Sequence, residues 1–81
     1  AGDPDAIGFY RASVALRPDA AMVHAHLGIA LSQNDRLEEA VECLRRAVAL
    51  GPDSALTQYN LASLLLRRRE FEEAADHAAV A

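Results

Sequence analysis

The spacing of two proline–aspartate pairs constrains this 81-residue chain more than any other feature of its sequence. Pro18-Asp19 and Pro52-Asp53 stand 34 residues apart. At the same spacing the segment Leu37-Glu38-Glu39-Ala40 recurs as Phe71-Glu72-Glu73-Ala74. A period of this length is typical of solenoids, in which each repeat is one supersecondary unit that buries its apolar face against its neighbours. The chain is therefore expected to be a stack of similar units.

The apolar residues within each repeat follow a helical period. Val23, Leu27, Ala30 and Leu31 recur at spacings of three and four residues, and the same pattern runs through residues 37–48. No alternating β-branched run or Asn-Gly turn indicates a strand or a hairpin. The sequence predicts helices over residues 4–16, 20–33, 37–50, 54–67 and 70–80. Because the links between them are short, consecutive helices should pack antiparallel.

Residues that begin and end helices stand near these boundaries. Asp3, Asp19 and Asp53 are side chains that can accept hydrogen bonds from the free N–H groups of a first helical turn. Gly51, followed by Pro52, is expected to end a helix in the left-handed conformation.

Small residues recur where two helices of one unit would cross. Gly28 and Ala62 stand on the first helices of successive units, and Ala40 and Ala74 stand on the second helices. Small side chains on both sides of a crossing allow the two backbones to approach closely. We therefore expect one tight crossing between residues 28 and 40 and another between residues 62 and 74.

The spacing of these residues resembles the tetratricopeptide repeat. The signature of that family is W-x2-L-G-x2-Y, then A-x3-F, then P, within one 34-residue helix–turn–helix unit. Residues 21–54 carry the corresponding positions as His24-x2-Leu27-Gly28-x2-Leu31, Ala40-x3-Leu44 and Pro52. Residues 55–81 carry them as Gln58-x2-Leu61-Ala62-x2-Leu65 and Ala74-x3-Ala78. Residues 3–20 resemble the second half of a unit, with Ala6-x3-Tyr10 and Pro18.

The resemblance implies an all-α fold, a right-handed α-α superhelix of antiparallel helix pairs. Residues 1–81 would form a single domain with a half repeat at 3–20, a full repeat at 21–54 and a truncated repeat at 55–81. His24 and Gln58 replace an aromatic residue of the family pattern, and Asp35 and Arg69 replace a turn glycine. The first residue is not methionine, so we expect the sequence to be an excerpt of a longer polypeptide.

The resemblance also implies where a partner binds. In tetratricopeptide proteins the first helix of each unit lines the inner, concave face, and peptides usually bind there. Asn60 stands where many relatives use an asparagine to hydrogen-bond the backbone of an extended peptide, and His26 stands at the equivalent site one unit earlier. Carried over to this sequence, the partner-binding residues are Met22, Ala25, His26, Ile29, Gln33, Leu56, Tyr59, Asn60, Ser63 and Arg67, with Ser32 and Leu66 on the same faces.

Composition argues against several other functions. Twelve acidic and eight basic residues give a net charge of −4, which does not favour nucleic-acid binding. No apolar run approaches the roughly 20 residues that span a bilayer, so no membrane partner is expected. One cysteine cannot form an internal disulfide, and a cytoplasmic location is expected. The use of arginine in place of lysine, with much alanine, indicates a bacterial source.

The reactive side chains do not form a catalytic or metal-binding pattern. His24 and His26 are two residues apart, whereas ligands on one helix need a spacing of three or four, and His77 is distant in sequence. Cys43 has no motif around it. Acidic residues gather in the first turns of two predicted helices, where the helix dipole favours negative charge. Arg67-Arg68-Arg69 is expected at a helix C-terminus for the same reason. We expect no enzyme activity, no cofactor and no metal.

Three functions remain after these exclusions. The favoured one is a protein–protein interaction module that binds a partner peptide or helix on its concave face. The second is a non-catalytic substrate-docking segment of a larger enzyme, such as a glycosyl- or sulfotransferase. The third is self-association through open ends of the solenoid, where Ile7, Phe9, Tyr10 and the alanine-rich C-terminal helix would be exposed.

Overall fold

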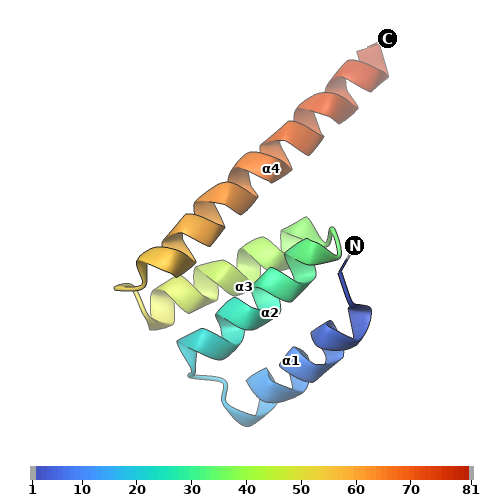
Figure 1. Cartoon of the computed structure of the whole chain (residues 1–81). Helices are drawn as coiled ribbons and strands as arrows, with labels where there is room; N and C mark the ends of the chain where they lie inside the picture. Colours follow the sequence, from blue (N-terminus) through green and yellow to red (C-terminus); the bar gives the residue numbers. More distant parts are fainter. Residues whose placement is uncertain (1, 81) are drawn as a thin grey trace.

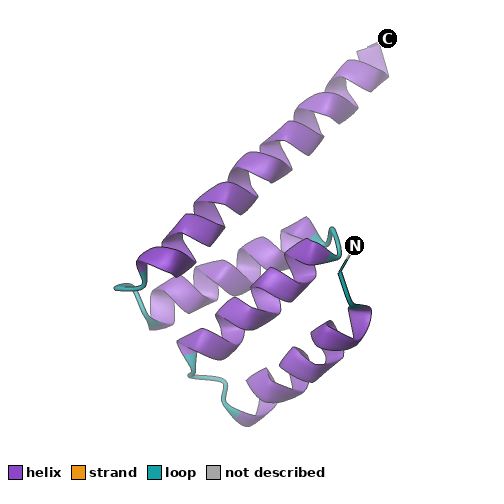
Figure 2. Cartoon of the chain, in the orientation of Figure 1, coloured by secondary structure: helices purple, strands orange, loops and turns teal. Residues whose placement is uncertain are grey.

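The computed structural model describes the backbone of residues 2–80 and the side chains of residues 2–75. It contains four helices, and the part of the chain that it describes has no strand (Figures 1 and 2). The helices are α1 (Pro4–Leu16), α2 (Ala21–Gln33), α3 (Leu37–Leu50) and α4 (Ala55–Val80). The predicted all-α fold is confirmed.

Each helix packs mainly on the next one along the chain. α2 contacts α1 and α3, α3 contacts α4, and a smaller contact joins α2 to α4. This is the arrangement expected where short links force sequential neighbours together. The molecule is elongated and thin, with extents of 47 × 28 × 16 Å.

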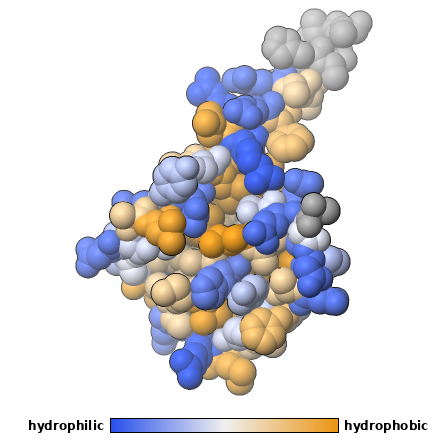
Figure 3. Space-filling model, viewed as in Figure 1, coloured by the Kyte–Doolittle hydropathy of each residue, from blue (hydrophilic) through white to orange (hydrophobic). Residues whose placement is uncertain are grey.

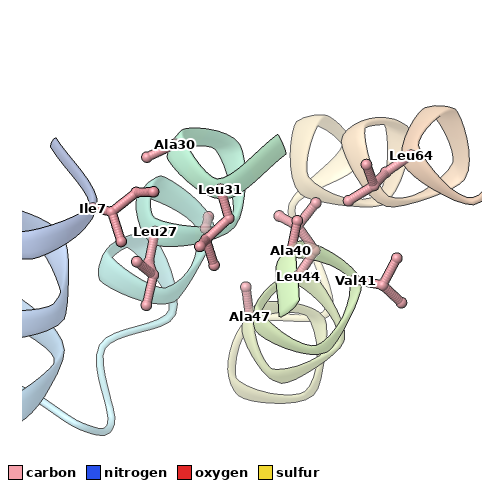
Figure 4. Close-up of a cluster of buried hydrophobic side chains, with 10 residues drawn as sticks. Ile7, Leu27, Ala30, Leu31, Ala40, Val41, Leu44, Ala47 and Leu64 are labelled. Carbon is pink, nitrogen blue, oxygen red and sulfur yellow. The ribbon is translucent and has the colours of Figure 1, made fainter. Parts of the chain in front are cut away.

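The core lies between α2 and α3 and extends to both outer helices. Leu31 and Leu44 are its largest fully buried side chains, each 1% exposed. Ile7 joins the core from α1 beside Leu27, and Leu64 joins it from α4 (Figure 4). The prediction that Ile7 lies at an open edge is therefore wrong. Ile7 is buried because it fills the space between α1 and α2.

The predicted tight crossing at Gly28 is confirmed. A Cβ atom at Gly28 would lie 2.8 Å from Cγ of Leu44 and 3.2 Å from the carbonyl oxygen of Ala40. Only a residue without a side chain fits this gap between α2 and α3.

The turn between α2 and α3 depends on two polar residues. Asp35 has φ 61°, the only positive φ at a non-glycine residue of the described chain. Aspartate visits this left-handed region more readily than most residues. The Asn34 side chain donates to the carbonyl oxygen of Ala30 at 2.9 Å and satisfies one free acceptor of the last turn of α2. The turn thus forms at Asp35, where the family pattern has a glycine.

The second predicted turn is absent, and this corrects the expected helices 54–67 and 70–80. Residues 55–80 form the single helix α4, so Ala62 and Ala74 lie on one helix and do not cross. Arg69 takes the place of Asp35, and a left-handed conformation costs such a residue roughly 1–2 kcal/mol. Arg69 Nε also pairs with Glu73 at 3.0 Å, and Arg68 Nε pairs with Glu72 at 3.7 Å. Both pairs span four residues and favour the continuous helix.

Of the three predicted aspartate N-caps, only the one at Asp3 is observed. Asp3 caps α1 by accepting from the N–H of Asp5 at 2.9 Å, as predicted. Asp19 does not cap α2, because the N-cap residue is Ala20, which makes no side-chain capping bond. Asp53 does not cap α4 either, since Ser54 Oγ accepts from the N–H of Thr57.

Gly51 serves close packing and not an unusual backbone. Its φ is −143°, so the predicted left-handed end of α3 is wrong. A Cβ atom at Gly51 would lie 3.0 Å from Cβ of Ala21. The absence of a side chain allows the end of α3 to approach the start of α2.

Candidate partner-binding groove

A groove runs between α2 and α4, above α3. It encloses about 220 Å³ and is lined by Ile29, Ser32, Gln33, Leu44, Asn60, Ser63, Leu64 and Arg67. We call it the α2–α4 groove. In Figure 3 apolar side chains are visible between α4 and the other three helices, with hydrophilic side chains beside them.

The floor of the groove is apolar and belongs to the core. Leu44 of α3 and Leu64 of α4 are both buried, and Ile29 of α2 is partly buried beside them. Leu44 is the same side chain that fills the gap at Gly28. The floor is therefore part of the core, and its shape is fixed by the packing of three helices.

Arg67 closes one end of the groove with two hydrogen bonds. Its Nη2 donates to the backbone carbonyl of Ser32 at 3.2 Å and to Oδ1 of Asp35 at 3.1 Å. These bonds tie α4 to the end of α2 and to the turn that follows it. The guanidinium of Arg67 is thus held at the groove by Asp35, the residue with the left-handed backbone in the turn.

Asn60 lies on the wall formed by α4. It is partly buried, and among the residues that the structure describes no side-chain hydrogen bond to it is found. A side-chain amide carries two N–H donors and a carbonyl acceptor, which is the set that pairs with both groups of a peptide backbone. Ser63 stands one turn further along the same wall and adds a hydroxyl group.

The structure brings together Ile29, Gln33, Asn60, Ser63 and Arg67 of the predicted site residues, and also Ser32. It does not place all of the others with them. Met22 lines a separate hollow at the turn between α3 and α4. Leu56 and Tyr59 are each 69% exposed on α4 and do not line the groove.

His26 and Ala25 depart further from the prediction. The ring of His26 lies 5.4 Å from the ring of Tyr10, so it contacts α1. Ala25 is 6% exposed and belongs to the core. It does not line the α2–α4 groove.

The two leucines of the floor could not be predicted as groove residues from the sequence. Leu44 and Leu64 have the helical spacing of core positions, and both are core residues. The helical spacing of Leu44 and Leu64 does not indicate that they also line the groove. That depends on how far apart α2 and α4 lie, which the repeat pattern does not contain.

Charged side chains on the outer faces form ion pairs. Glu39 accepts from Arg36 at 2.8 Å and from Arg11 at 2.9 Å. The hydrogen bond from Arg36 is the main reason why the pKa of Glu39 lies below its usual value of 4.5, and Arg11 adds to the effect. Glu38 pairs across helices with Arg68 at 3.4 Å.

The arginine run does not lie at a helix C-terminus, which corrects the sequence expectation. Arg67, Arg68 and Arg69 lie within α4, because that helix continues to Val80. Each of the three pairs with a carboxylate. The acidic residues Glu72 and Glu73 are likewise in the middle of α4, so these pairs and not the helix dipole explain their positions.

The described residues hold no metal-binding cluster, and the thiol of Cys43 is partly buried. No group of three or more histidine, cysteine, aspartate or glutamate side chains is close enough within them to hold a metal ion. Burial raises the pKa of Cys43, which lowers the thiolate fraction. The side chain of His77 lies outside the described residues. No helix in this part of the chain combines the length and the apolar character of a membrane span.

Comparison with known proteins agrees with the repeat pattern. A family model described as tetratricopeptide repeat matches residues 4–55 and again residues 26–81. No curated protein matches the chain. Repeats of this family generally mediate protein–protein interaction and are typically non-catalytic. The two matches together span residues 4–81, and the chain belongs to the tetratricopeptide-repeat family.

Proposed function

We propose that the chain binds an extended peptide segment of a partner protein in the α2–α4 groove. The observation that carries this proposal is the combination of a fixed apolar floor with polar groups along the walls. Leu44 and Leu64 supply the floor, and Asn60 and Ser63 stand above it. Binding sites of this kind obtain affinity from apolar contact and orientation from a few well-placed polar groups.

The polar groups on the walls of the groove favour an extended peptide over a helix. An α-helix with its side chains is roughly 10–12 Å across and satisfies its own backbone. An extended segment is thinner and leaves its backbone N–H and C=O groups free, and the amide of Asn60 can pair with both. The family resemblance points to the same role for Asn60.

Arg67 favours a segment that is not strongly basic near the Asp35 end of the groove. Its positive charge is partly compensated by Asp35, so it offers moderate and not full attraction for a carboxylate. Since Ala25 and Ile29 occupy two positions at which some relatives carry carboxylate-clamping residues, the groove is not suited to binding a C-terminal carboxylate. We therefore infer an internal segment of the partner with an apolar residue over the floor.

Selection from a library of displayed peptides on the 81-residue chain tests this proposal. Peptides obtained in this way should bind Asn60→Ala about 5- to 10-fold more weakly, because a net hydrogen bond contributes about 1 kcal/mol. Glu70→Ala is the matched control on the same helix, since Glu70 is exposed and does not line the groove. Equal affinities for wild type and Asn60→Ala would contradict the proposal, provided that circular dichroism shows equal helicity.

Self-association is a second candidate, favoured by the exposed apolar residues of α1. Phe9 is 67% exposed and Leu16 is 83% exposed, whereas Tyr10 is partly covered by its contact with His26. Exposed ends of solenoids tend to stack. Light scattering over a concentration series tests it, and a constant monomer mass would remove it. A docking segment of a glycosyl- or sulfotransferase would use the same α2–α4 groove and stays a prediction.

A further inference from the structure

A second hollow lies along α2, nearer to the start of that helix than the α2–α4 groove. It encloses about 310 Å³, and its walls include Met22, Leu50, Pro52, Asp53 and Thr57. We call it the Met22 hollow. Figure 1 shows the start of α2, the end of α3 and the start of α4 together at one end of the molecule. Met22 is 68% exposed, so the hollow presents an apolar side chain to solvent.

The Met22 hollow and the α2–α4 groove follow the same two helices. Met22 and Ile29 are seven residues apart on α2, which places them about 20° apart around the helix and about 10 Å apart along it. Gln33, at the far side of the groove, is about 17 Å from Met22 along α2. Thr57 of the hollow and Leu64 of the groove are likewise seven residues apart on α4. One extended segment can therefore cross both hollows.

The separation of the two hollows selects the spacing of the partner's side chains. The middle of the groove lies between Ile29 and Gln33, about 13 Å from Met22 along α2. An extended segment rises about 3.3 Å per residue, and its successive side chains point to opposite faces. Side chains on the face toward the helices are therefore about 7, 13 or 20 Å apart. Only residues four positions apart match the separation of the hollows.

The two ends of this path carry opposite charges. Arg67 stands at the end of the groove, and Asp53 stands at the Met22 hollow. Asp53 is exposed, and it forms no ion pair within the part of the chain that the structure describes. A basic residue of the partner is therefore attracted to the Met22 hollow and not to the Arg67 end.

We propose that the Met22 hollow is a second pocket of the peptide site and sets the register of the partner segment. The segment places one apolar side chain in the α2–α4 groove and a second one, four residues away, against Met22 and Leu50. A basic residue next to the second apolar residue lies near Asp53. Burial of the second apolar side chain supplies affinity, because Met22 and Leu50 lose contact with water. This inference rests on the proposed peptide groove and adds a spacing and a charge that the groove alone does not require.

Leucine scanning of a peptide tests the spacing. The peptide is one selected on the 81-residue chain, and its anchor is the residue whose alanine substitution weakens binding most, both to wild type and to Met22→Ala. All other apolar residues of the peptide are replaced by alanine, and leucine is placed in turn two to six residues from the anchor on either side. Leucine four residues away on one side should tighten binding about 10-fold, and leucine three or five residues away less than about 2-fold.

Two variants of matched exposure assign this gain to the Met22 hollow. Met22→Ala should reduce the gain to below about 3-fold, because the side chain that covers the second leucine is shortened. Leu56→Ala should leave the gain unchanged, since Leu56 is 69% exposed and lines neither hollow. Fluorescence anisotropy of the labelled peptides measures the affinities.

The outcomes separate this inference from the proposed function. A gain that does not depend on spacing, or that survives Met22→Ala, would overturn the second pocket even if Asn60→Ala still weakens binding. Loss of a dimer in Met22→Ala without any change in peptide affinity would mean that a second copy of the chain occupies the hollow, and the proposal would fail. If Asn60→Ala also has no effect on peptide affinity, the proposed groove itself is wrong.

Asp53→Asn tests the charge at the Met22 hollow. Asp19→Asn is the matched control, because Asp19 stands 34 residues earlier in the repeat, is also exposed and does not line the hollow. An arginine next to the second leucine, on the side away from the anchor, should tighten binding to wild type and Asp19→Asn about 3-fold at low salt. It should not tighten binding to Asp53→Asn. Equal gains for the two variants would contradict the proposed register.

Discussion

Gly28 and Leu44 interlock at the centre of the molecule. A single added carbon at Gly28 would lie 3.1 Å from Cδ2 of Leu44 and 2.8 Å from its Cγ, and the second distance is closer than Cβ atoms pack in proteins. Leu44 is almost fully buried and also forms part of the floor of the α2–α4 groove. The contact that joins α2 to α3 therefore also sets the shape of the candidate site.

This contact predicts opposite effects of one substitution at two helical glycines. Gly28→Ala should lower the free energy of unfolding by about 1–2 kcal/mol, because overpacking outweighs the roughly 1 kcal/mol gain in helix propensity. Gly8→Ala should raise it by about 0.5–1 kcal/mol, since nothing lies within 4 Å of a Cβ atom there. Urea unfolding of both variants measures the two changes. Stabilisation by Gly28→Ala would show that the crossing is looser than described.

The turn between α2 and α3 gives a second prediction. Asp35 has φ 61°, and both Asp35→Gly and Asp35→Ala remove the same ion pair with Arg67. The difference in stability between the two variants therefore isolates the cost of the left-handed backbone. Asp35→Gly should be more stable than Asp35→Ala by about 1 kcal/mol, because glycine adopts a positive φ without steric cost. Thermal unfolding compares the two variants, and equal melting temperatures would argue against a left-handed residue at this turn.

The ion pairs of Glu39 predict a pH dependence of stability. Arg36 and Arg11 lower the pKa of Glu39 in the folded protein below 4.5, so the unfolded chain binds this proton at a higher pH than the folded chain does. The stabilisation is present above about pH 4.5 and is lost as the pH falls through the lower folded pKa. Solvent screening keeps it modest, because the pairs are exposed.

Glu39→Gln isolates this contribution from those of the other carboxylates. The stability difference between wild type and Glu39→Gln should be largest near pH 7 and should shrink as the pH is lowered toward 3. Unfolding by urea at a series of pH values measures it. A difference that stays constant over the whole range would mean that Glu39 gains nothing from its two arginine partners.

Much of the fold could be predicted from the sequence, because it depends on local and periodic signals. The helical spacing of Leu27, Leu31 and Leu44 marks the core, and Gly28 marks the tight crossing. The turn at Asp35 could be predicted from its place in the repeat, since aspartate tolerates the required backbone. These features are determined by the residues concerned and by their nearest neighbours on the helices.

The course of residues 67–70 could not be predicted in the same way. The repeat pattern places a turn at Arg69, whereas helix propensity and two ion pairs favour a continuous helix. A repeat pattern carries no information about the ion pairs and helix propensity that oppose the turn. The extent of the groove could not be predicted for a related reason, because the place of the buried Leu64 at its floor depends on the separation of α2 and α4.

Paramagnetic broadening locates a bound partner peptide relative to the α2–α4 groove. A library-selected peptide carrying one nitroxide label is added to the 15N-labelled 81-residue chain, and amide signals are recorded before and after reduction of the label. A peptide bound in the groove should broaden the amide signals of Ile29, Asn60 and Ser63 most strongly. Broadening centred on Phe9 and Leu16 of α1, or a library that yields no peptide able to broaden the groove amides, would contradict it.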